Sequence, residues 1–165
     1  MKVLRKLSIA LLGLCAVVLL SACGSRESVS PIATTSLETF TASLDLAQEV
    51  PAPTIPAGAV PSGSGSVTLD PLTKVLTGSF TTINVVGATA AHIHDGDFGV
   101  AGLVVVPLTE SPAGSGIWVV PTAPVATVLN DLQIARLRAG GFYVNVHTTL
   151  NLTGEIRGQL LPGSP

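Results

Sequence analysis

The sequence is short of charge, of aromatic side chains and of cysteine. Among 165 residues, charged residues make up 11% and aromatic residues 4%, and Lys and Arg together number 8. A protein that binds nucleic acid needs clustered positive charge to neutralise phosphates, so we exclude nucleic acid as a partner. The chain also lacks a recognisable Ser-His-Asp set, a phosphate-binding glycine loop and a pair of catalytic carboxylates. We therefore predict a binding module rather than an enzyme.

The N-terminal segment has the order of a targeting signal. Three basic residues precede an apolar run over Leu7–Leu20, which small residues close. This order predicts a signal peptide at residues 1–22, and the run is too short for a stable membrane span. Removal of the three basic residues would change the net charge of the protein from −2 to −5.

The end of the apolar run, Leu20-Ser21-Ala22-Cys23, resembles the lipobox of bacterial lipoproteins. The resemblance implies that Cys23 becomes the lipidated first residue and anchors the protein outside the cytoplasm, in the cell envelope. Gly24 in place of aspartate implies the outer membrane, if the organism has one. The alternative is an ordinary secretory signal. Since Cys15 would leave with the signal and Cys23 would carry lipid, no thiol remains for a disulfide.

Residues 23–39 are rich in Ser, Thr and Glu and show no periodicity, which predicts a flexible tether. From residue 40 onward, apolar and polar residues alternate, as they do in half-buried strands. Turn residues divide the pattern into short strands, about eight of which we expect to form the fold. The nine candidate segments are Phe40–Ala47, Gly65–Leu69, Val75–Phe80, Ile83–Val86, Ala91–His94, Gly102–Pro107, Gly116–Val120, Phe142–Thr148 and Glu155–Leu161. We expect Gly102–Pro107 to be buried.

One stretch, residues 128–141, departs from the strand pattern. Asn130 suits a helix N-cap, basic residues at 136 and 138 suit the C-terminal end of the dipole, and Gly140 suits a left-handed stop. We expect a helix whose Leu129, Leu132 and Leu137 pack on the core. The whole pattern predicts an all-β fold, an antiparallel Greek-key sandwich or flattened barrel of about eight strands with one short connecting helix.

All three histidines of the chain lie in two segments, 91–96 and 143–148. In a strand, residues two apart point to the same face, so His92 and His94 project side by side. His147 lies on the polar face of a strand whose other face is apolar. If these two faces converge, three imidazoles meet.

Three imidazoles on rigid strands suit copper or zinc. Asp95 or Asp97 would then supply an oxygen ligand or orient a histidine. The alternative is that the imidazoles only form hydrogen bonds in a polar layer.

The face that carries the third histidine has further polar residues. Asn145 precedes His147 on the same face, and Glu155 and Arg157 share a face of the next strand. Any of the three could support a metal site. For Glu155 and Arg157 we favour an ion pair that stabilises the last hairpin.

The residues Ala91-His92-Ile93-His94, with Gly102-Leu103-Val104-Val105 after them, resemble the chordin (CHRD) domain. The longer motif, from Leu137-Arg138-Ala139-Gly140-Gly141 through Phe142–Thr148 to Gly154–Leu160, strengthens the resemblance. It covers residues 40–161 and implies a single exported β-sandwich domain. The family's biochemical role is largely undefined, so the resemblance implies fold and context more than activity.

The His-x-His strand and the distant third histidine are also similar to the copper ligands of copper/zinc superoxide dismutases. Such an enzyme needs a bridging or fourth histidine, and this chain has no other. Three hypotheses remain. The first is a lipid-anchored module that binds copper or zinc through His92, His94 and His147. The second is a metal-free structural or protein-interaction module with a partner in the envelope, and the third is a mononuclear copper redox enzyme.

Overall fold

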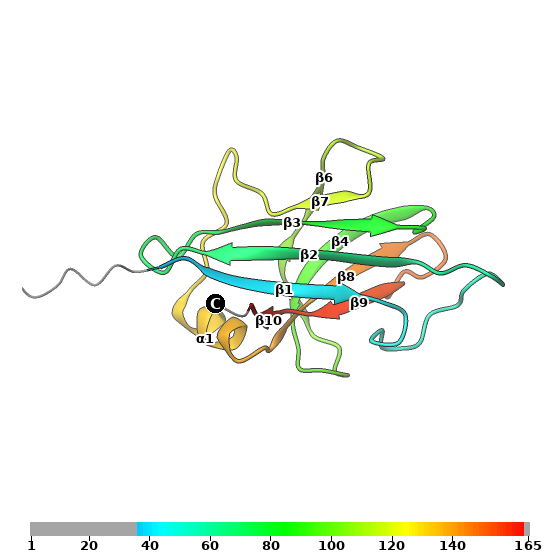
Figure 1. The fold of residues 1–165 in the computed structure, drawn as a ribbon, viewed down its shortest axis with the longest axis horizontal. Helices are drawn as coiled ribbons and strands as arrows, with labels where there is room; N and C mark the ends of the chain where they lie inside the picture. The colour runs from blue at the N-terminus through cyan, green and yellow to red at the C-terminus, as the bar shows by residue number, and fades with distance from the viewer. Residues whose placement is uncertain (1–35, 164–165) are drawn as a thin grey trace, which may run out of the picture. The chain divides into compact units, whose positions relative to one another are not determined.

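The computed structural model describes residues 36–163, so the predicted signal peptide, Cys23 and most of the tether lie outside the described residues. The described part folds into short strands and one helix (Figure 1). The elements are β1 (Glu38–Leu44), β2 (Ser62–Leu69), β3 (Leu76–Ile83), β4 (Ala88–Asp95), β5 (Leu103–Pro107), β6 (Thr109–Glu110), β7 (Ile117–Val119), α1 (Asp131–Arg138), β8 (Phe142–Thr148), β9 (Ile156–Gln159) and β10 (Leu161–Pro162). Across these residues no helix has the length and apolar character needed to span a membrane.

The strands form two antiparallel sheets. One has six strands in the order β10-β1-β2-β3-β7-β6, and the other has four in the order β5-β4-β8-β9. In Figure 1 strands β4 and β8 of the four-stranded sheet run obliquely behind the six-stranded sheet, and β9 lies beside β1. The prediction of an all-β sandwich is confirmed, and no closed barrel forms among residues 36–163.

Alternation along the strands builds the core between the sheets. In β1, Phe40, Ala42 and Leu44 are buried while the residues between them are exposed. In the four-stranded sheet, the core-facing residues of β4 and β8 are fully buried, and they are Ala91, Ile93, Phe142, Val144 and Val146. Because side chains alternate across a strand, the histidines of both strands lie on the opposite, outer face of this sheet.

Three details differ from the sequence predictions. β1 begins at Glu38, inside the predicted tether, and ends at Leu44. No separate strand forms at Ile83–Val86, because Asn84 adopts a φ of 60° and ends β3. β5 is an edge strand of its sheet and not buried throughout, and Leu103 is 84% exposed.

Helix α1 begins and ends where the sequence predicts. The Asn130 side chain accepts a hydrogen bond from the Gln133 backbone, and the Gln133 side chain accepts one from the Asn130 backbone, each at 2.9 Å. Gly140 has a φ of 72°, which is the left-handed stop. The predicted packing of Leu132 is wrong, because Leu132 is 74% exposed while Ile134 is buried.

Two loops cover part of the outer face of the four-stranded sheet. The loop after β1 contributes Glu49, which accepts hydrogen bonds from Asn145 of β8. The loop between β4 and β5 contributes the carbonyls of Asp97 and Val100, which accept from Arg157 of β9. These loops bury polar side chains that would otherwise lie in solvent, and the loop between β4 and β5 also contacts His94 through the Gly102 carbonyl.

Candidate metal centre

The candidate site lies where β4 and β8 are paired. His92 and His94 leave the outer face of β4, and His147 leaves the outer face of β8. The register of the two strands sets His92 opposite Asn145 and His94 opposite Tyr143. His94 is two residues from His92 in the sequence, and His147 is 55 residues from His92. The pairing of the two strands therefore brings the three side chains together.

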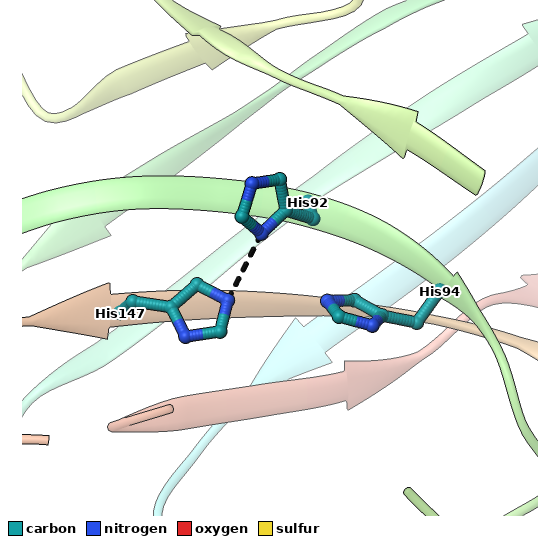
Figure 2. Close-up of side chains that lie close together, drawn as sticks. All are labelled: His92, His94 and His147. Atoms are coloured by element: carbon teal, nitrogen blue, oxygen red, sulfur yellow. Dashed lines mark hydrogen bonds between the residues drawn. The ribbon is translucent and has the colours of Figure 1, made fainter. Parts of the chain in front are cut away.

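The three imidazoles form a compact cluster (Figure 2). The ring centres of His92 and His147 are 4.9 Å apart, and His94 lies 5.6 Å from His92 and 6.0 Å from His147. One ring nitrogen from each residue can be chosen so that all three lie within 4.8 Å of one another. The structure thus brings together all three sequence-predicted ligands.

Hydrogen bonds to carbonyl groups define the tautomers of two rings. Nδ1 of His94 lies 3.0 Å from the Gly102 carbonyl oxygen, and Nδ1 of His147 lies 3.0 Å from that of Leu152. A carbonyl oxygen only accepts, so each Nδ1 carries the proton and each Nε2 of the neutral ring keeps a free lone pair. The Nε2 atom of His94 is buried and has no hydrogen-bond partner.

His92 completes the cluster through Nδ1, which lies 3.0 Å from Nε2 of His147 (Figure 2). Because His147 Nε2 has no proton, His92 Nδ1 donates this hydrogen bond in the metal-free protein. A metal–nitrogen distance of about 2.0–2.1 Å requires the three nitrogens to lie roughly 3.4 Å apart. The nitrogens now lie within 4.8 Å of one another. Small side-chain rotations that adjust these distances, together with a change of tautomer on His92, would meet this requirement.

Burial also favours the neutral form of the rings. His94 is 7% exposed, and His92 and His147 are half-buried. Burial lowers the pKa of each of the three imidazoles below its ordinary value. Metals bind the neutral imidazole, so burial favours the charge state that ligation requires near pH 7.

Tyr143, for which the sequence favours a structural role over a direct role in the site, supports His94. The two rings are stacked, with centres 4.9 Å apart and planes at 9°. The Gly102 backbone N–H donates to the Tyr143 hydroxyl at 3.0 Å, while the Gly102 carbonyl accepts from His94. One glycine backbone therefore orients both rings.

Arg157 lies beneath this stack and does not pair with Glu155. Its guanidinium carbon is 3.5 Å from the centre of the Tyr143 ring, and its nitrogens donate to backbone carbonyls of the β4–β5 loop. Glu155 accepts instead from Thr148 Oγ1 at 2.8 Å and Asn151 Nδ2 at 2.9 Å. The predicted ion pair is wrong because the two side chains meet different partners around the hairpin.

Asn145 is buried, and its hydrogen-bond partner, Glu49, is not predicted by the sequence. Its Nδ2 donates to both carboxylate oxygens of Glu49 at 3.0 and 2.8 Å, while its Oδ1 has no partner. Burial raises the pKa of Glu49 above its ordinary value. Glu49 precedes a proline-rich loop and shows no strand periodicity, so no sequence pattern marks it.

Asp95 and Asp97 lie beside helix α1 and form ion pairs with it. Arg136 donates to Asp95 Oδ1 at 2.8 Å and to Asp97 Oδ1 at 2.9 Å. Neither carboxylate forms a hydrogen bond with an imidazole among those found in residues 36–163. The structure therefore brings the three histidines together but directs these two carboxylates to Arg136.

Comparison with known protein families identifies the domain. The family model described as the CHRD domain matches residues 40–160 of the chain. No curated protein and no solved structure matches it. The matched segment contains both strands that carry the histidines.

Proposed function

Because the chain belongs to the CHRD domain family, we propose that it is an exported binding module that holds one copper or zinc ion through His92, His94 and His147. The ligand atoms would be Nδ1 of His92 and Nε2 of the other two rings. Bound metal would supply a Lewis-acidic or redox-active centre at the outer face of the sheet.

One observation carries the proposal, namely the buried Nε2 of His94 without a hydrogen-bond partner. A buried polar atom that lacks a partner costs about 1–3 kcal/mol. The carbonyl of Gly102 keeps the proton on Nδ1, so the unpaired lone pair points into the cluster (Figure 2). A metal ion would satisfy this atom, whereas a purely structural histidine would be expected to find a donor.

Metal stoichiometry tests the proposal. Protein produced from the full chain should bind one equivalent of Cu(II), Cu(I) or Zn(II). His94→Ala should lower the affinity by more than about a hundredfold, since loss of a ligand exceeds loss of its supporting contacts. Circular dichroism should show that the variant remains folded. Equal metal content in the variant and the parent would reject the site.

Asp97→Asn provides a matched control for this experiment. The Asp97 carboxylate is bound to Arg136, and its side chain is 69% exposed. We expect its removal to leave the metal affinity unchanged within about twofold, since surface ion pairs contribute little. A large loss in this variant would instead make Asp97 part of the site.

The second candidate function is a metal-free interaction module. The hydrogen bond between His92 and His147 favours it, because it satisfies both nitrogens without a metal. Indifference of stability and of histidine spectra to all three metals would support this candidate. Under either function we propose binding rather than catalysis. A redox enzyme would require turnover of superoxide or another small oxidant by the copper-loaded protein.

We also propose that the protein is anchored in the cell envelope through a lipid on Cys23. The signal-like N-terminus and the family support an extracytoplasmic location. On this proposal the protein associates with the membrane through the lipid and with a protein of the envelope, and it does not bind nucleic acid.

A further inference from the structure

The three donors of the candidate site are uncharged, and within residues 36–163 no carboxylate forms a hydrogen bond with them. Each of the nearby acidic side chains has another partner. Glu49 accepts from Asn145 and from the Val50 backbone, and Glu155 accepts from Thr148 and Asn151. A divalent ion here would keep its full double charge, because a neutral ligand set offsets none of it.

A buried cation lies on the same face of the sheet. Arg157 is 1% exposed, and its guanidinium group lies against the Tyr143 ring at 3.5 Å. Strand β8 lies between β4 and β9, so Tyr143 has His94 on one side and Arg157 on the other. The cation is therefore separated from a ligand by a single aromatic ring.

The charge of Arg157 is only partly offset. Its donors go to neutral oxygens, namely the carbonyls of Val100 and Asp97 and the amide oxygen of Gln159. Among the described residues no salt bridge joins it to a carboxylate. Glu49, the acidic side chain that stabilises the charge of Arg157, does so only at longer range and as a minor contribution.

We infer, on the premise that the three histidines bind a metal, that the site selects Cu(I) over Zn(II) and Cu(II), and that Arg157 contributes to this selection. Repulsion from a fixed cation is proportional to the charge of the bound ion, so it is twice as large for a dication. The cost of moving an ion into a buried site rises still more steeply with charge. Cu(I) is monovalent and accepts three neutral ligands without a fourth.

Competition between metals tests the selection directly. Protein from the full chain is mixed under anaerobic conditions with one equivalent each of Cu(I) and Zn(II), and the bound metal is measured after desalting. Cu(I) should occupy more than about nine-tenths of the sites, which corresponds to an affinity ratio of roughly a hundredfold. Zinc in most sites would overturn the inference while leaving metal binding intact. Absence of both metals would overturn the proposed function as well.

Charge variants test the part played by Arg157. In Arg157→Gln, the affinity for Zn(II) should rise about tenfold and that for Cu(I) about threefold, the square root of that factor. Arg157→Lys retains the charge and serves as the matched control, in which both affinities should change equally. Equal factors for the two metals in Arg157→Gln would show that the effect is only structural.

Glu49→Gln gives an independent test if the buried arginine variants fail to fold. Glutamine is nearly isosteric and removes a negative charge, so the sign of the effect reverses. We expect Zn(II) affinity to fall by a larger factor than Cu(I) affinity. An unchanged ratio of the two affinities would contradict the electrostatic basis of the selection.

Discussion

At the scale of single residues, His94 has the most constrained environment of the three imidazoles. Its Nδ1 donates to Gly102, its face is stacked on Tyr143, and its Nε2 is buried without a partner. His92 and His147 bond each other and are half-buried, so they have more freedom to adjust. A metal would therefore meet one fixed ligand and two adaptable ones.

Gly154 provides a stability prediction at this scale. It has a φ of 135°, and an added Cβ would overlap Asn145 Nδ2 and lie 2.5 Å from Glu49 Oε2. Gly154→Ala should lower the free energy of unfolding by about 3 kcal/mol, because backbone strain and steric overlap act together. Urea denaturation measures this change.

Gly99→Ala is the control for that measurement. Gly99 has a φ of 75° and no atom within 4 Å of an added Cβ, so only the backbone term of about 1 kcal/mol applies. Equal losses in the two variants would show that the contact with Asn145 and Glu49 is unimportant.

At the scale of elements, the strand ladder determines which side chains meet. The histidine strands could be predicted because alternation is a local property, and their pairing follows once β4 and β8 lie side by side. The helix limits were also predictable, since Asn130 and Gly140 are local signals.

The remaining parts of the site depend on long-range contacts that have no local signal. Glu49 and Asn145 form a hydrogen bond although they are 96 positions apart in the sequence. The positions of the loop carbonyls that accept from Arg157 likewise depend on the tertiary fold. The predicted ion pair of Glu155 with Arg157 failed for the same reason. The left-handed backbone conformation of Asn84, which ends β3, is likewise not predicted by the neighbouring residues in the sequence.

The N-terminus of α1 gives a prediction at the element scale. Asn130→Ala removes the acceptor for the Gln133 backbone N–H and should cost about 1 kcal/mol of stability. Asn130→Asp keeps an oxygen at this position and should be nearly neutral. Chemical denaturation of both variants provides the comparison, and an equal loss in both would contradict the capping role.

At the scale of the whole molecule, the three histidines should make stability depend on pH. Burial lowers their pKa below the ordinary value of 6.5. Just below pH 6.5 the unfolded chain therefore binds more protons at these residues than the folded protein does. Their contribution is present above pH 6.5 and is lost as the pH falls through the lower folded values. Stability of the metal-free protein should decrease in this window.

A variant with all three histidines replaced by asparagine isolates the effect. Glu49 opposes it, because a raised carboxyl pKa adds stability as the pH falls, but Glu49 is common to both proteins. As the pH falls below 6.5, the parent should lose more stability than the variant, so the unfolding free energy of the parent minus that of the variant should decrease. A difference that does not change with pH would contradict the expectation.

The anchoring proposal also concerns the molecule as a whole. Cys23→Ser should release the protein from the membrane fraction of expressing bacteria and abolish incorporation of labelled fatty acid. Cys15→Ser, within the predicted signal peptide, should leave both unchanged. Equal membrane association of the two variants would reject lipidation at Cys23.

Gly102 connects these scales through its two backbone groups. Its carbonyl accepts from His94 and its N–H donates to Tyr143, so the loop before β5 cannot lift without releasing both rings. Deuterium exchange at this one amide would thus record each opening of the site. Slower exchange on addition of metal would report ligation from a position that never touches the ion.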